Sequence, residues 1–437
     1  MSKIKNIVKE QIHIHLFIYL VKWTLLAGIV GILAGSASAF FLVSLDWAAE
    51  TRNTYSWFLF LLPFGGMLVS FLYWKYGLNS AKGNNLLIEQ AQGAKESIPF
   101  RMAPLVLFGT IITHLFGGSA GREGTAVQMG GAFSEFTGKL FKLDELDRKI
   151  IIICGISSGF GSVFGTPLAG TVFGLEVLAL GLIKHEAIFP AFIAAFVGDL
   201  VTTAWGVGHH HYEIGAIPVI SFVLILKIIL AAILFGLTST LFSELTHWLK
   251  KQYTKIFPNP MIKSFVGGVV IIALVYVVDT RKYLGLGIPL IDDAFEGDVS
   301  PFTFITKLVF TSLTLGSGYQ GGEVTPLFAI GSTLGSSLGD ILHVSIPFLA
   351  ALGFIGVFCG ATNTPIACFI MGIELFGSEA SLYLFLVCII SYLFSGHTGI
   401  YTSQQISVSK SKLLAVAKKE TLETIRENKN NRGNNKK

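Results

Sequence analysis

The stretch Gly117-Gly-Ser-Ala-Gly-Arg-Glu-Gly-Thr125 lies between two apolar runs and returns in altered form 200 positions later. The shared residues are Gly121, Glu123, Thr125 and Gly131 in the first copy, and Gly321, Glu323, Thr325 and Gly331 in the second. A further match pairs Thr166-Pro-Leu-Ala-Gly170 and Gly174-Leu-Glu176 with Thr364-Pro-Ile-Ala-Cys368 and Gly372-Ile-Glu374. Unrelated segments rarely share such a series, so the sequence predicts two homologous halves with a boundary near 205–220.

The composition around this repeat is that of a membrane protein. Of the 437 residues, 52% are hydrophobic and only 14% are charged, whereas a soluble domain is about 25% charged. A soluble protein could not cover so much apolar surface with charge. The 48 glycines allow helices to approach closely. The apolar runs are too long and too continuous for a β-barrel. An all-α polytopic membrane protein is therefore expected.

Several apolar runs are shorter than the roughly 20 residues that a full span needs, for example 104–116 and 303–316. Broken helices persist in membranes only where they are buried in protein or line a wet cavity, and transporters place their substrate sites there. An odd number of spans per half would make the halves inverted. The expected division is an N-terminus at 1–14, repeats at 15–212 and 213–406, and a basic tail at 407–437.

Charge is concentrated at the two ends. The net charge is +5, and the residues from 407 onward contribute nine Lys or Arg against three Asp or Glu. Lys3, Lys5 and Lys9 precede the first apolar run. The positive-inside rule therefore predicts that both termini are cytoplasmic. A basic tail beside anionic lipid is favoured over a tail that binds nucleic acid.

The first motif contains a charged pair, Arg122 and Glu123, which is costly between apolar segments. With a helix beginning near Gly124, the free N–H groups and the helix dipole would favour an anion there. An ionised Glu123 would compete with a diffusible anion, and its protonation would free the site. This would couple an anion to a proton. An interfacial ion pair that caps a helix is an equally good interpretation of the motif taken alone.

The matching element, Gly316 to Pro326, supplies the carboxylate of Glu323 and the hydroxyl of Thr325. Pro326 is expected at the first position of a helix, where proline is favourable. The segment 316–321 also fits a dinucleotide-binding pattern. Its copy near residue 121 lacks that pattern, and no β-α-β context is expected, so nucleotide binding is not predicted.

Other motifs have plainer interpretations. Gly155-Ile-Ser-Ser-Gly159 resembles a hydrolase elbow around Ser157, but helix packing explains it better, as it does Gly31-Ile-Leu-Ala-Gly35. The run His209–His211 is favoured as a solvated loop over a metal site. His114 is favoured as a core residue over a proton relay.

Two acids and the cysteines complete the candidates. Glu176 and Glu374 occupy equivalent repeat positions near helix ends, so we expect structural hydrogen bonds for both. Cysteines lie only in apolar runs and are expected to be unpaired core residues: Cys154, Cys359, Cys368 and Cys388. No cofactor and no metal site are predicted.

The three elements at 121–125, 166–170 and 321–326 resemble those of the CLC family of anion channels and proton-coupled antiporters. The resemblance covers nearly the whole chain. It implies an inverted repeat of tilted, incomplete helices, a homodimer, and Glu123 as the gating glutamate. The residues that the resemblance assigns to the anion pathway are Gly83, Asn84, Asn85, Gly121, Arg122, Gly124, Glu323, Val324, Thr325 and Tyr401.

Departures from the chloride pattern indicate a branch of this family. Chloride members usually carry Gly-Ser-Gly-Ile-Pro where this chain reads Gly83-Asn-Asn-Leu-Leu87, and Gly-x-Phe-x-Pro where it reads Gly322-Glu-Val-Thr-Pro326. Chloride exchangers place an inner glutamate at the position of Val177. The first motif ends in Thr125 instead of proline. These departures resemble the bacterial fluoride/proton antiporters, in which Asn84 would take the selectivity position.

Fluoride is small and strongly hydrated, so it requires strong hydrogen-bond donors such as Asn84 and Thr325. Without an inner glutamate, Glu123 would carry its proton through by swinging, aided by Thr325 and Tyr401. We therefore expect a fluoride-exporting, proton-coupled antiporter of a bacterial inner membrane. A chloride antiporter or channel is the alternative within the family, and an intramembrane hydrolase built on Ser157 is the rival from another class.

Overall fold

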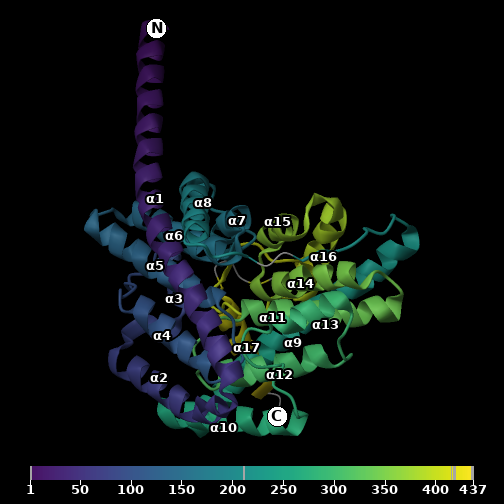
Figure 1. Ribbon diagram of the computed structural model, residues 1–437. Helices are drawn as coiled ribbons and strands as arrows, with labels where there is room; N and C mark the ends of the chain where they lie inside the picture. The colour runs from purple at the N-terminus through teal and green to yellow at the C-terminus, as the bar shows by residue number, and fades with distance from the viewer. Residues whose placement is uncertain (1, 210–211, 415, 417–419, 435–437) are drawn as a thin grey trace.

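The computed structural model describes residues 2–209, 212–414, 416 and 420–434. Nearly all regular structure in these residues is helical, and Figure 1 shows the helices packed side by side in one body. The N-terminal part of α1 (Ser2–Thr54) stands clear of that body (Figure 1). Strands β1 (Ala179–Leu180) and β2 (Gln405–Ile406) pair in parallel over two residues. The predicted all-α fold is confirmed.

Five helical stretches of the described residues are long and apolar enough to cross a membrane: Ile12–Thr54, Ser56–Tyr76, His185–Ala204, Phe222–Ile256 and Pro260–Val278. Shorter apolar helices also occur, one between the second and third long stretches and the others after the fifth, and the sequence predicts such helices to stop within the bilayer. They include α4 (Met102–Leu115), α12 (Thr303–Gly316), α14 (Ile346–Thr362) and α15 (Pro365–Phe376).

The remaining helices fill the space between these. They are α2 (Leu62–Tyr76), α3 (Asn84–Gln92), α5 (Glu123–Leu140), α6 (Glu145–Phe164), α7 (Pro167–Glu176), α8 (Ile188–Ala204), α9 (Phe222–Ile256), α10 (Pro260–Val278), α11 (Ile288–Glu296), α13 (Val324–Leu342), α16 (Ser381–Phe394) and α17 (Leu422–Asn434). Short 3-10 turns are η1 (Ser56–Leu61), η2 (Leu78–Lys82), η3 (His185–Ala187), η4 (Ser378–Ala380) and η5 (Lys412–Leu414).

The same local device breaks a helix in each half of the chain. Helix α6 ends at Gly165 with φ 70°, and α7 begins at Pro167. Helix α14 ends at Asn363 with φ 59°, and α15 begins at Pro365. A left-handed residue stops a helix, and proline is suited to start the next one. The repeated Thr-Pro motifs therefore mark equivalent breaks.

Glycines bring the helices of the core into close contact. A Cβ atom on Gly130 of α5 would lie 2.2 Å from the backbone oxygen of Gly155 on α6. In the second half, a Cβ on Gly331 of α13 would lie 2.1 Å from the oxygen of Gly353 on α14. Gly35 of α1 approaches α8 equally closely. Only glycine permits these approaches, so the packing interpretation of both glycine motifs is confirmed.

Helices α7 and α15 complete each other at their ends. The carboxylate of Glu374 on α15 accepts from the N–H groups of Leu168 and Ala169 at the start of α7, at 2.9 and 2.7 Å. Glu176 on α7 accepts from Ile366 and Ala367 at the start of α15, at 3.2 and 2.9 Å. Each acid satisfies N–H groups that have no acceptor within their own helix. The predicted structural role of both glutamates is confirmed.

Candidate functional site

The two repeated loops meet through their backbones. The N–H of Gly121 donates to the oxygen of Gly322 at 2.6 Å, and the N–H of Gly322 donates to the oxygen of Gly121 at 2.8 Å. A reciprocal pair of this kind joins the start of α5 to the start of α13. The segments that carry Glu123 and Glu323 are thereby held side by side.

Glu123 lies at this junction and is only 1% exposed. Its carboxylate accepts a hydrogen bond from the hydroxyl of Thr325 on α13. The other carboxylate oxygen lies against the backbone, since a Cβ on Gly121 would be 2.6 Å from it and a Cβ on Gly322 would be 3.0 Å from it. The two glycines therefore make the space that the carboxylate occupies.

The predicted helix starts need one correction. Helix α5 begins at Glu123, beside the expected Gly124, and α3 begins at Asn84 as the resemblance implies. Pro326, however, is the third residue of α13, which begins at Val324. The first N–H groups of a helix lack intrahelical acceptors, so proline fits anywhere in the first turn. The prediction that Pro326 starts the helix is wrong for this reason.

A cavity of about 420 Å³, here called the vestibule, opens on one side of this junction. Its lining brings together residues of both halves, among them Gly83, Asn84, Asn85, Glu323 and Tyr401. The lysines Lys82, Lys250 and Lys263 also line it. The predicted pathway residues at the start of α3, Glu323 just before α13, and Tyr401 thus share one cavity.

A smaller cavity of about 40 Å³ lies elsewhere against the same junction. It is lined by Arg122, Thr325 and Tyr212, among others. Glu123 lines neither cavity. Arg122, next to it in sequence, and Thr325, which donates to its carboxylate, line the smaller cavity, while Gly321 and Glu323 of the opposite loop line the vestibule. The buried carboxylate therefore lies at a junction whose residues line both cavities.

Asn84 and Val324, two further predicted residues, lie at the junction that holds this carboxylate. The Nδ2 atom of Asn84 would lie 3.1 Å from a Cβ on Gly124, so the amide adjoins the start of α5. The Oδ1 atom of Asn84 is buried and lacks a hydrogen-bond partner among the described residues. Val324 is buried at the start of α13. Asn85 differs, because its side chain is bonded to the segment that follows Tyr401.

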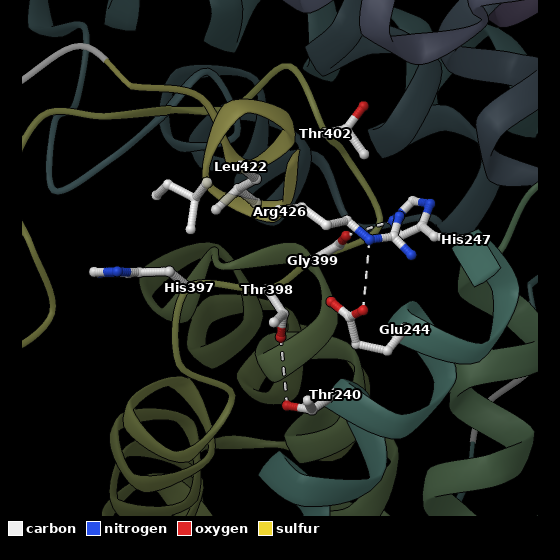
Figure 2. A pocket seen from close by; sticks show the side chains of 10 residues that line it. Thr240, Glu244, His247, His397, Thr398, Gly399, Thr402, Leu422 and Arg426 are labelled. Atoms are coloured by element: carbon white, nitrogen blue, oxygen red, sulfur yellow. Dashed lines mark hydrogen bonds and ion pairs between the residues drawn. The ribbon is translucent and has the colours of Figure 1, made fainter. Parts of the chain in front are cut away.

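Tyr401 is 5% exposed and belongs to a segment, 399–402, with cavities on two sides. Ile400, Tyr401 and Thr402 line the vestibule. Gly399 and Thr402 line a second cavity of about 270 Å³, together with His247 of α9 and Arg426 of α17 (Figure 2). In that view Arg426 reaches toward Glu244 of α9, at 3.5 Å.

Sequence reasoning missed the lysine that fixes the first loop. Lys307 of α12 is fully buried, and its ammonium donates to Ser119 Oγ and the oxygen of Gly285 at 2.9 Å. It also donates to the oxygen of Tyr283 at 3.1 Å. A single lysine within an apolar run was the available signal, because a buried cation must have partners.

The position at which chloride exchangers carry a glutamate is apolar and enclosed. Val177 is 2% exposed. Its backbone oxygen accepts from Nε2 of Gln404 at 2.9 Å, and the same amide donates to the oxygen of Thr362 at 2.8 Å. Gln404 therefore ties this position to the segment after Tyr401 by hydrogen bonds that carry no titratable group.

The competing motifs give no second site in the part of the chain that the structure describes. Ser157 lies inside α6, fully buried, and its hydroxyl approaches the oxygen of Thr171 at 3.4 Å. The segment 316–321 joins two helices. No group of three His, Cys, Asp or Glu side chains suited to a metal occurs among the described residues. The four cysteines are buried and free.

The histidine motifs are placed only in part. His209 lies 3.8 Å from Asp199 and is mostly buried, while His210 and His211 are outside the described residues. His114 is 2% exposed, and its Nε2 has no partner among the residues described. Its buried position agrees with the core interpretation.

Comparison with known proteins places this geometry in a family. The sequence profile of the voltage gated chloride channel family matches residues 65–396. A chloride/fluoride channel protein of Pseudomonas syringae pv. tomato is 47% identical over 398 residues, covering 90% of this chain and 88% of that protein. An H(+)/Cl(-) exchange transporter ClcA of Vibrio parahaemolyticus is 28% identical over 411 residues, with 84% of each chain covered.

Solved structures agree. The crystal structure of a CLC-type fluoride/proton antiporter matches with a TM-score of 0.87 and 35% identity, over 89% of this chain and 98% of that one. A slow cyanobacterial Cl-/H+ antiporter matches with a TM-score of 0.74 at 20% identity, covering 85% and 94%, and so shares the fold. The chain belongs to the voltage-gated chloride channel (CLC) family of membrane transporters and channels.

Proposed function

We propose that this protein exports fluoride in exchange for protons. The observation that carries the proposal is the carboxylate of Glu123, buried where the two repeated loops meet and bonded to Thr325. An ionised carboxylate held there occupies the place of an anion, and its protonation releases that place. Anion movement and proton binding would then use the same group in turn.

The donors around this carboxylate favour a small, strongly hydrated anion. The amide of Asn84, the hydroxyls of Thr325 and Tyr401, and the first N–H groups of α3, α5 and α13 converge on the junction and the vestibule. Gly83, Gly121, Arg122 and Gly124 contribute to the same helix starts. Hydrogen bonds to an anion are the strong ones, and fluoride needs them most because its dehydration is costly.

Glu323 is a second acid on the route. It lines the vestibule, and Lys250 is close enough to interact with it electrostatically. The conjugate acid of fluoride has an acidity near that of a carboxylic acid, so fluoride and a protonated glutamate can exchange a proton readily. With Val177 at the position of the inner glutamate, we assign proton transport to Glu123 and Glu323 along the anion route.

Reconstituted vesicles provide the test. Vesicles loaded with fluoride, with potassium and valinomycin to collapse the membrane potential, would lose fluoride to an electrode while the lumen acidifies. Glu123→Gln should abolish the acidification, because the amide cannot take up and release the proton, and any fluoride release that remains should be uncoupled from protons. Glu379→Gln, at an exposed 3-10 turn, is the matched control and should behave as the unaltered protein.

The alternatives predict different traces. A passive channel would release fluoride with no coupled acidification. The Vibrio relative is named as a chloride/proton exchanger. A protein of that kind would move chloride at a rate equal to or greater than its fluoride rate. Fluoride/proton exchange that persists unchanged in Glu123→Gln would contradict the proposal.

We also infer a bacterial inner-membrane location, cytoplasmic termini and a homodimer. The membrane location is supported by the five membrane-length helices. The cytoplasmic termini are supported by the basic residues at both ends of the chain. The homodimer rests on family resemblance. Protease protection in right-side-out vesicles tests the termini, and cross-linking in native membrane tests the dimer.

A further inference from the structure

Three polar side chains on α3 lie on one face of that helix. Asn85, Glu89 and Gln92 follow one another at spacings of four and three residues, which places them one above the other. All three reach the same residue, Ser403, which is two positions after Tyr401. We call this set the α3 ladder.

The ladder uses every polar group of Ser403. Its N–H donates to Asn85 Oδ1 at 3.1 Å, and its hydroxyl donates to Glu89 Oε1 at 2.7 Å. Its backbone oxygen accepts from Gln92 Nε2 at 3.1 Å. Asn85 also donates from Nδ2 to Thr402 Oγ1 at 3.3 Å. Ser403 is 5% exposed, so solvent competes little for these bonds.

The ladder joins the two side chains that line the vestibule from opposite halves of the chain. Asn84 directly precedes Asn85 at the start of α3, and Tyr401 directly precedes Thr402. Each is therefore within two residues of a ladder contact. The position of Asn84 relative to Tyr401 is transmitted through these few hydrogen bonds.

Packing is one support of the tyrosine segment, because Tyr401 lies in the hydrophobic core edge-on to Phe173. Residues 399–402 have the vestibule on one side and the 270 Å³ cavity of Figure 2 on the other. Its further supports are the bond between His247 Nε2 and the oxygen of Gly399 at 2.9 Å, the donation from Ile400 N to Ala361 at 2.9 Å, and that from Glu423 N to Thr402 at 3.1 Å. None of these supports leads to α3.

We propose that the α3 ladder sets the separation of Asn84 and Tyr401 and thereby the size of the anion that the vestibule passes. The residues of the ladder act by positioning, through their neighbours. Loosening the ladder widens the passage, so chloride is accepted more readily while donors converge less well on fluoride. The proposal deepens the proposed function and rests on it. It also reassigns the Asn85 side chain from anion binding to support of the tyrosine segment.

The test measures initial rates of fluoride and chloride transport in the same reconstituted preparation. Ser403→Ala and Glu89→Leu should each lower the fluoride-to-chloride rate ratio roughly five- to tenfold, the effect of about one hydrogen bond. The fluoride KM should rise while proton coupling persists. Glu89→Gln keeps an acceptor for the Ser403 hydroxyl and should retain the ratio of the unaltered protein.

Glu96→Leu is the matched control. Glu96 and Glu89 both pair with Lys82, at 2.9 and 3.0 Å, and only Glu89 of the two contacts Ser403. Loss of the Glu96 carboxylate should therefore leave the fluoride-to-chloride rate ratio unchanged. If Ser403→Ala does not fold, the partly exposed Glu89 still permits the measurement.

Two outcomes contradict different statements. An unchanged ratio in folded Ser403→Ala or Glu89→Leu would overturn the role of the ladder, as would an equal fall in Glu96→Leu. Absence of proton-coupled fluoride transport in the unaltered protein would overturn the proposed function itself, and it is measured first.

Discussion

The two repeated loops, 117–122 and 317–322, are matched in sequence and differ in how they are fixed. The first is held by a buried ammonium, because Lys307 donates to Ser119. The second is held by a phenol, because Tyr319, at the position equivalent to Ser119, donates to the oxygens of Leu62 and Ser264 at 2.9 and 3.0 Å. The two matched loops are thus held by unrelated supports.

The acids that follow the two loops also differ in their surroundings. Glu123 is enclosed between the helix starts, while Glu323 lines the vestibule. The loop with the charged support carries the enclosed acid, and the loop with the neutral support carries the acid that meets the cavity. The comparison indicates that the two loops share the backbone junction and differ in the surroundings of the acid that each of them carries.

The largest effect is expected from Lys307→Met. Three oxygens would lose their donor, at about 1–3 kcal/mol for each buried group left unsatisfied, and relief of the buried charge would offset part of this loss. We expect a net fall of about 3 kcal/mol in the free energy of unfolding, read as a lower melting temperature in detergent.

Lys282→Met is the control for this change. Lys282 directly precedes Tyr283, whose backbone oxygen accepts from Lys307. The Nζ atom of Lys282 pairs at the surface with Asp293 Oδ2 at 3.1 Å. An exposed pair contributes little to stability, so little change in melting temperature is expected. Equal melting temperatures for Lys307→Met and the unaltered protein would show that the ammonium does not fix the first loop.

A smaller effect is expected from Tyr319→Phe. The hydroxyl alone is removed, and two carbonyl oxygens lose one shared donor, so the free energy of unfolding should fall by about 1–2 kcal/mol. The ring continues to fill the space left by Gly66. A loss as large as that of Lys307→Met would mean that the two loops are supported equally, against the contrast drawn above.

The smallest effects are expected where the halves are alike. Glu176→Gln and Glu374→Gln each keep one oxygen acceptor and lose the charge at a helix start, at about 1 kcal/mol. Glu176 is more buried than Glu374, so its change should be slightly larger. Melting temperatures of both variants and of the double variant would measure this. A several-fold difference between the single variants would show that the caps, too, have diverged.

Much of the fold follows from the sequence because its signals are local. The Thr-Pro breaks, the glycine contacts and the capping roles of Glu176 and Glu374 depend on repeat positions that can be aligned. The start of α5 at Glu123 follows from the same logic. The predicted start of α13 at Pro326 is two residues too late, because the first turn of a helix tolerates proline at more than one position.

The supports of the site could not be predicted in the same way. Ser403 and its partner Glu89 are 314 positions apart, and Lys307 and Ser119 are 188 apart. No local sequence pattern predicts contacts between residues so far apart. The resemblance assigns Asn85 to the anion pathway, whereas its side chain is bonded to Thr402 and Ser403, far away in the sequence.

The exchange of caps between α7 and α15 has a consequence for the origin of the molecule. Each half begins one helix that only the acid of the other half completes, so a single half would leave that helix start without its acceptor. Two identical half-length chains related by a twofold axis would satisfy the same need twice, each with its one glutamate. The present chain makes the corresponding reciprocal contact within one polypeptide.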